Sequence, residues 1–154
     1  VLPEFITKVA NSGCSVFIIH ARKALLQGLS PKDNRIIPPL EYPLVYEMQK
    51  KFPGLDIILN GGLTELKEMK SCVKNRVAGV MIGREAYENP SLLLNVDNEI
   101  FDQKEKVRSM KDAVRNMIEY CDREKAEGTE IKGILKFTNS PRTEAPDRVI
   151  TKFD

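Results

Sequence analysis

Three short apolar runs, separated by stretches of helical periodicity, constrain the fold of this chain most strongly. The runs cover residues 15–19, 55–59 and 77–82. Their length and β-branched content are typical of strands in a parallel sheet covered on both faces. Apolar residues recur at helical spacing over 41–52 and 64–74, and Thr64 is the predicted N-cap of the second helix. This alternation predicts βαβ units and an α/β fold.

The C-terminal part of the chain follows a different pattern. A longer helix is predicted from about residue 102 to residue 127, because apolar residues step by three and four and Gly128 suits the position after a helix end. The tail over 139–154 has scattered charge and no periodicity, so we predict that it is irregular. The sequence therefore divides into residues 1–95, a helical segment over 96–138, and the tail.

Composition excludes several protein classes. The chain is 42% hydrophobic and 30% charged with a net charge of +2, which is ordinary for a globular protein and does not demand a polyanionic partner. No apolar run approaches the length of about 18 residues that a membrane span needs, and the first residues do not form a signal peptide. Three cysteines without CxxC spacing indicate neither a disulfide framework nor a metal site, and favour a reducing cytoplasmic or organellar interior.

Glycines follow the second and third predicted strands at their carboxyl ends. Asn60, Gly61 and Gly62 come directly after the second strand, and Gly83 and Arg84 directly after the third. Glycine lets a backbone approach a ligand closely, and a guanidinium grips phosphate oxygens with two hydrogen bonds. Adjacent loops of this kind form phosphate sites in parallel α/β barrels. The alternative is that each is only a tight turn between strand and helix.

Basic residues gather after the first predicted strand. His20 ends that strand, on the side where such folds place their active sites, although a lone histidine is often structural. Arg22 and Lys23 follow, as RNA contacts or as a solvated rim. Lys32 and Arg35 lie in a connection of about 20 residues, a length more often functional than not. The positive charge of this connection suits a nucleic-acid backbone.

These motifs occur in an ordered series that resembles one enzyme family. The series comprises residues 20–24 (HARKA), 28–31 (GLSP), 34–35 (NR), 38–40 (PPL), 42–43 (YP), 60–62 (NGG), 80–87 (VMIGREAY) and 89–90 (NP). It resembles the tRNA-dihydrouridine synthases, in particular their A-type subfamily, from residue 17 to about residue 93. The resemblance is weaker through the helical segment and ends after Phe137.

The resemblance implies an FMN enzyme that uses NADPH to reduce the C5=C6 bond of uridine in the tRNA D-loop. Hydride would pass from flavin N5 to C6, and a cysteine would protonate C5. The family's flavin-contacting histidine falls on His20, and its tRNA contacts fall on Lys32 and Arg35. Its phosphate-binding positions fall on Asn60, Gly61, Gly62, Gly83 and Arg84.

The resemblance also implies that this chain is the C-terminal part of a TIM (β/α)8 barrel followed by a helical segment. A complete barrel needs about 250 residues, and residues 1–95 suffice for its strands 6 to 8. None of the cysteines aligns with the catalytic one, so we expect that residue in a preceding half and expect this chain alone to be inactive. Exposed barrel edges predict self-association. Two alternatives remain: a non-catalytic phosphate- or RNA-binding half-barrel, and another FMN-barrel oxidoreductase.

Overall fold

The computed structural model describes residues 1–104, 109–130 and 148–151, which belong to two compact units. The first unit comprises Val1–Ile82 and the C-terminal residues from Arg148, and the second comprises Gly83–Asp147. The boundary comes directly after the third strand, earlier than the predicted boundary after residue 95. The reason is local: the short helices that follow residue 83 contact one another.

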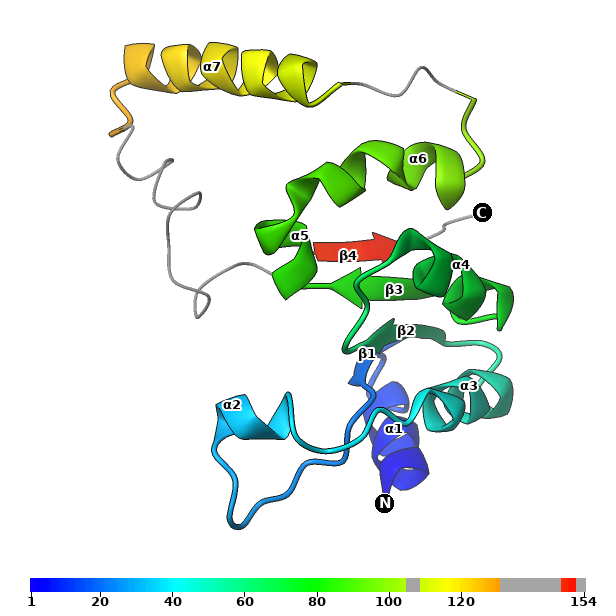
Figure 1. The fold of residues 1–154 in the computed structure, drawn as a ribbon. Helices are drawn as coiled ribbons and strands as arrows, with labels where there is room; N and C mark the ends of the chain where they lie inside the picture. The colour runs from blue at the N-terminus through cyan, green and yellow to red at the C-terminus, as the bar shows by residue number, and fades with distance from the viewer. Residues whose placement is uncertain (105–108, 131–147, 152–154) are drawn as a thin grey trace. The chain divides into compact units, whose positions relative to one another are not determined.

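A parallel sheet lies at the centre of the first unit (Figure 1). Its strands are β1 (Val16–His20), β2 (Asp56–Asn60) and β3 (Gly79–Ile82), side by side in chain order. His20 pairs with Asn60, and Asn60 pairs with Met81, so the carboxyl ends of the three strands meet at the same end of the sheet. The α/β class and the positions of the three strands are confirmed.

Four helices belong to the first unit. α1 (Leu2–Ala10) precedes β1, α2 (Pro31–Asn34) and α3 (Tyr42–Lys51) lie between β1 and β2, and α4 (Leu66–Lys74) lies between β2 and β3. α3 contacts β2 and α4 contacts β3, which confirms the two helices predicted between the strands. The predicted N-cap Thr64 is wrong, because α4 begins after Glu65. The Glu68 carboxylate accepts a hydrogen bond from the Thr64 N–H at 3.4 Å, so a side chain within the helix reaches back to Thr64.

The core of the first unit is built around β2. Its residues Ile57, Ile58 and Leu59 are at most 2% exposed, as expected for a strand covered on both faces. The helices contribute further buried side chains, namely Ile6, Val45, Met48, Met69 and Cys72. The Gln49 side chain joins α3 to the start of β2, since its amide donates to the Leu55 carbonyl at 2.9 Å and accepts from the Ile57 N–H at 3.1 Å.

A fourth strand, β4 (Arg148–Thr151), pairs with β3 in the antiparallel sense, with Val80 opposite Ile150. The prediction of an irregular tail is therefore wrong for residues 148–151; residues 139–147 and 152–154 lie outside the described residues. The segment contains the β-branched residues Val149, Ile150 and Thr151, which suit a strand. A run this short has no detectable period, and only the available edge of β3 makes it a strand.

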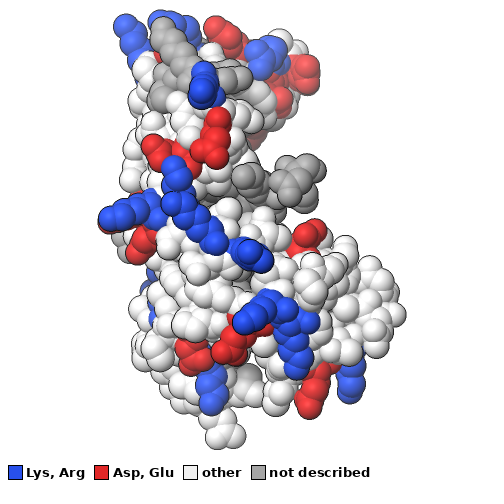
Figure 2. All heavy atoms as spheres, turned by 90° about the vertical axis from the view of Figure 1, so that its right-hand side faces the viewer, with Lys and Arg blue, Asp and Glu red and all other residues white. Residues whose placement is uncertain are grey.

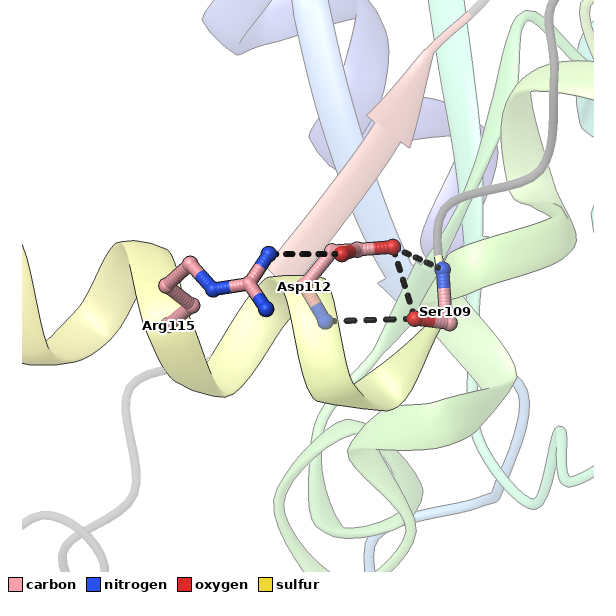
Figure 3. A network of polar contacts seen from close by, with 3 residues as sticks. All are labelled: Ser109, Asp112 and Arg115. Atoms are coloured by element: carbon pink, nitrogen blue, oxygen red, sulfur yellow. Dashed lines mark hydrogen bonds and ion pairs between the residues drawn. The ribbon is translucent and has the colours of Figure 1, made fainter.

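The second unit is helical. It contains α5 (Arg84–Glu88), the 3-10 helix η1 (Pro90–Asn95), α6 (Val96–Glu99) and α7 (Met110–Ala126). α7 begins later than the predicted residue 102 because Ser109 caps it. The Ser109 hydroxyl accepts from the Asp112 N–H at 3.2 Å, and the Asp112 carboxylate accepts from the Ser109 N–H at 3.2 Å (Figure 3). Gly128 follows the C-cap with φ +90°, as predicted.

Candidate cofactor and RNA site

The turn after β2 requires glycine at two successive positions. Gly61 and Gly62 have φ values of +121° and +68°, which side chains other than glycine rarely adopt. A Cβ on Gly61 would lie 3.2 Å from the Leu40 Cδ2 and 3.3 Å from the His20 Cε1. A Cβ on Gly62 would lie 2.5 Å from the Leu40 Cδ1. The left-handed backbone and the closeness of Leu40 and His20 therefore both require glycine at positions 61 and 62.

Tyr42 holds this turn from the first turn of α3. Its hydroxyl donates to the Gly61 carbonyl at 2.7 Å. Burial, with smaller contributions from the nearby Cys72 and Glu68, raises the pKa of Tyr42 to about 12, and Arg22 opposes this shift. The hydroxyl therefore stays protonated and donates at neutral pH. Sequence reasoning gave Tyr42 no role, because nothing in the pattern indicates where a tyrosine hydroxyl will find its acceptor.

β1 and β2 bring two of the predicted residues beside the glycine turn. His20 and Asn60 are register partners at the last position of each strand, and both are half-buried. The pairing continues one residue further, since the Ala21 N–H donates to the Asn60 carbonyl at 2.8 Å. His20, Asn60, Gly61 and Gly62, all predicted to contact the cofactor, thus lie together in the first unit.

Arg22 is held by the loop that follows β1. Its Nη1 donates to the carbonyl of Pro38, and the Glu41 N–H donates to the Ala21 carbonyl at 2.7 Å. The Nε of Arg22 is buried and has no hydrogen-bond partner among the described residues. A buried donor without an acceptor is unfavourable, so an anionic or carbonyl group beside it would be stabilised. The neighbouring Lys23 is exposed.

The Asn34 side chain fixes the connection between β1 and α3 through hydrogen bonds to main-chain groups of that connection. The Asn34 Oδ1 accepts from the Leu25 N–H at 2.7 Å, and its Nδ2 donates to the Leu25 carbonyl at 2.8 Å. Ser30 caps α2 within the same connection. Lys32 and Arg35 lie exposed on this segment, so their charged groups are available to a ligand.

Gly83 and Arg84 are the first two residues of the second unit. Gly83 is the N-cap of α5 with φ −108°, so it does not adopt the left-handed conformation seen after β2. Arg84 is the first residue of α5 and is exposed. Because the two glycine-containing turns belong to different compact units, their joint use in one phosphate site stays a prediction.

None of the three cysteines belongs to the segments that follow β1 and β2. Cys14 precedes β1, and Cys121 lies on α7. Cys72, on α4, accepts a hydrogen bond from the Tyr46 hydroxyl at 3.4 Å. Burial raises the pKa of the Cys72 thiol, so it remains protonated and weakly nucleophilic at neutral pH.

Charges of both signs are mixed on one face of the molecule. On the face shown in Figure 2, lysine and arginine side chains are interspersed with aspartate and glutamate. Within the described ranges, no three or more His, Cys, Asp or Glu side chains are grouped to hold a metal ion. The helices of those same ranges include none with the length and apolar character needed to cross a membrane.

Comparison with known proteins identifies the family. A model of the dihydrouridine synthase family matches residues 2–148, a range that includes β1, β2, β3 and every predicted site residue. The chain belongs to the dihydrouridine synthase family. This confirms the resemblance carried by the ordered motifs and disfavours other FMN-barrel oxidoreductases.

Curated relatives within the family are about half identical to this chain. The tRNA-dihydrouridine(20/20a) synthase of Vibrio cholerae is 48% identical over 146 residues, which cover 91% of this chain and 44% of the relative. The protein of the same name from Escherichia coli K12 is 47% identical over 136 residues, covering 88% and 39%. This chain therefore spans about two fifths of the length of these relatives, and it matches their C-terminal portion.

Proposed function

We propose that this chain forms the cofactor-phosphate and tRNA-facing part of an FMN- and NADPH-dependent synthase that reduces D-loop uridines of tRNA to dihydrouridine. In this proposal β1, β2 and β3 are strands 6 to 8 of a (β/α)8 barrel. One observation carries the proposal: in a member of this family, the Gly61–Gly62 turn is held at the carboxyl end of β2 beside His20.

The residues after β1 and β2 fit a flavin nucleotide. FMN, when bound, supplies the hydride that reduces the uridine. Gly61 and Gly62 are the proposed phosphate contacts of the first unit, through their main-chain N–H groups, and the family resemblance adds Arg84, whose guanidinium suits a phosphate. His20 is the proposed flavin-contacting side chain.

The connection between β1 and α3 supports a role in binding tRNA. Lys32 and Arg35 are exposed and lie on a segment clamped by Asn34, so they contact phosphates at a small cost in conformational entropy. The exposed Lys23 extends this basic surface, and Arg22 beside it is the remaining proposed tRNA contact. A target uridine must leave its stack to reach a flavin, and phosphate contacts on both sides of it would hold the backbone.

We propose that this chain alone does not complete the reaction. Reduction of uridine needs a proton at C5, and the family resemblance assigns that proton to a cysteine. Cys72 is buried with a raised pKa and hydrogen-bonded to Tyr46, while Cys14 precedes β1. Neither thiol belongs to the segments that follow β1 and β2, where the uridine would be held.

Preference for FMN over riboflavin tests the phosphate site, because the two ligands differ only in the phosphate. In fluorescence titrations of the purified chain, we expect FMN to bind more tightly, and we expect Arg84→Ala to weaken FMN binding by about 10- to 100-fold, as for a hydrogen bond to a charged group. Riboflavin binding should not change. Equal affinity for both flavins, or no binding of either, contradicts the proposal. Dihydrouridine formed by this chain from NADPH and unmodified tRNA would show that the chain alone is active.

The salt dependence of tRNA binding tests the basic segment. We expect Lys32→Ala combined with Arg35→Ala to weaken tRNA binding about tenfold and to reduce the slope of log K against log salt by about 1.5–2, because two phosphate contacts are lost. Lys50→Ala combined with Lys51→Ala removes the same charge from the exposed end of α3 and is the matched control. Equal effects of both pairs would contradict a specific tRNA-facing segment. Binding of tRNA without FMN would favour the non-catalytic RNA-binding module.

A further inference from the structure

The peptide bond between Gly61 and Gly62 presents its two polar groups to opposite sides of the turn. The Gly61 carbonyl accepts the hydroxyl of Tyr42 at 2.7 Å. This peptide is trans, and in a trans peptide the C=O and N–H point in opposite directions, so the Gly62 N–H points away from Tyr42. Gly61 is buried and Gly62 is exposed. The Gly62 N–H donates to none of the described residues, so it is available to a ligand.

Tyr42 reaches the turn because the segment that carries it is fixed at the end of β1. The Glu41 N–H donates to the carbonyl of Ala21, the residue after β1, at 2.7 Å. Leu40, on the other side of Glu41, occupies the space that a side chain at Gly62 would need, since a Cβ there would lie 2.5 Å from the Leu40 Cδ1. One short segment therefore confines the turn with an apolar side chain and holds it with a hydroxyl.

The opposite orientation of this peptide would present an oxygen where the N–H now lies. Rotating the peptide by about half a turn exchanges the two groups and moves φ of Gly62 from +68° to a negative value. Glycine adopts both conformations readily, so the residue itself does not select between them. An outward N–H attracts an anion, whereas an outward carbonyl oxygen repels it. Reversal would also take the acceptor away from the Tyr42 O–H, which disfavours it.

We propose that Tyr42 is a positioning residue, whose hydroxyl fixes the Gly61–Gly62 peptide so that the Gly62 N–H faces the phosphate of the cofactor. The identity of the ligand rests on the proposed function, and the role of Tyr42 rests on the geometry of the turn. Because the carbonyl and the N–H lie on opposite sides of the peptide, Tyr42 acts on the phosphate without contacting it.

Titrations of the purified chain with FMN and with riboflavin, followed by fluorescence, test the effect on phosphate binding. We expect Tyr42→Phe to weaken FMN binding about 3- to 10-fold, as for the loss of one hydrogen bond, and to leave riboflavin binding unchanged. Tyr46→Phe is the matched control, because it removes the same atom from the same helix, where the hydroxyl donates to the Cys72 Sγ at 3.4 Å. It should bind FMN like the original chain.

Two results of these titrations overturn the proposal. The first is a Tyr42→Phe variant that keeps the full preference for FMN over riboflavin. The second is a variant that loses affinity for both flavins alike, since this would show a general structural role and no specific effect on the phosphate. A far-UV circular dichroism spectrum confirms that each variant is folded.

The conformation of the turn is measured in the absence of flavin. The three-bond couplings between the amide and α protons of Gly62 depend on φ, so nuclear magnetic resonance of the labelled chain reports the orientation of the peptide. We expect the original chain and Tyr46→Phe to show couplings for φ near +68°, and Tyr42→Phe to show an average of two orientations. Unchanged couplings in Tyr42→Phe overturn the proposal. If they change while the original chain binds FMN and riboflavin equally, the proposed phosphate site is wrong and Tyr42 still holds the turn.

Discussion

Replacing Gly62 by alanine is expected to lower the free energy of unfolding by about 2–5 kcal/mol. Two costs combine at this position. The left-handed backbone at φ +68° costs a residue with a Cβ about 1–2 kcal/mol, and the new methyl group lies 2.5 Å from the Leu40 Cδ1, a contact typical of overpacking. Urea denaturation followed by circular dichroism measures the loss. FMN affinity should fall with it if the turn binds the phosphate.

Substitutions at two other glycines distinguish the cost of the left-handed backbone from the cost of the contact with Leu40. Gly13 has φ +97° but no atom within 4 Å of a Cβ, so Gly13→Ala should show the backbone cost of about 1–2 kcal/mol alone. Gly54 has neither a left-handed backbone nor a close neighbour, so Gly54→Ala should change stability by less than about 0.5 kcal/mol. If Gly62→Ala is no more costly than Gly13→Ala, then Leu40 does not confine the turn.

Replacing Leu59 by alanine is expected to cost about 2–5 kcal/mol, a large fraction of the stability of a domain this size. Leu59 is fully buried in the central strand β2, so truncation leaves a cavity between neighbours that are themselves close-packed. The same denaturation experiment measures the effect. Loss of this residue should also weaken FMN binding, because β2 positions the Gly61–Gly62 turn.

Matched substitutions test whether burial is the cause. Leu26 is 95% exposed, so Leu26→Ala removes the same atoms at a cost below about 0.5 kcal/mol. Leu59→Met keeps the volume and should cost less than about 1.5 kcal/mol. A small effect of Leu59→Ala would mean that the first unit relaxes around the cavity and that β2 is not its core.

The sequence predicted the features that depend on local patterns. Apolar runs of five or six residues marked β1, β2 and β3, because a strand covered on both faces has no polar alternation. Helical spacing located α3 and α4. The role of the glycines after β2 was also predictable, because two glycines after a strand indicate a main chain that approaches a ligand or a neighbouring segment closely.

Features that depend on long-range partners were not predictable in this way. The hydrogen bond from Tyr42 to Gly61 joins residues 19 apart, and the bond from Arg22 to Pro38 joins residues 16 apart. Neither pairing follows from the spacing of residue types. The same reasoning explains β4, whose residues become a strand only because β3 offers them an edge.

By itself, the sequence determined the family, the alternation of β1, α3, β2, α4 and β3, and the set of residues available for a cofactor and for tRNA. These properties follow from residue types at short spacing, which local backbone preferences and burial translate directly into structure. Only the tertiary structure decided how the glycine turn is held, by Tyr42 and Leu40, and that β4 pairs with β3. Hydrogen bonds and contacts between distant segments settle these properties, because each donor or edge takes whichever partner the packed chain brings to it.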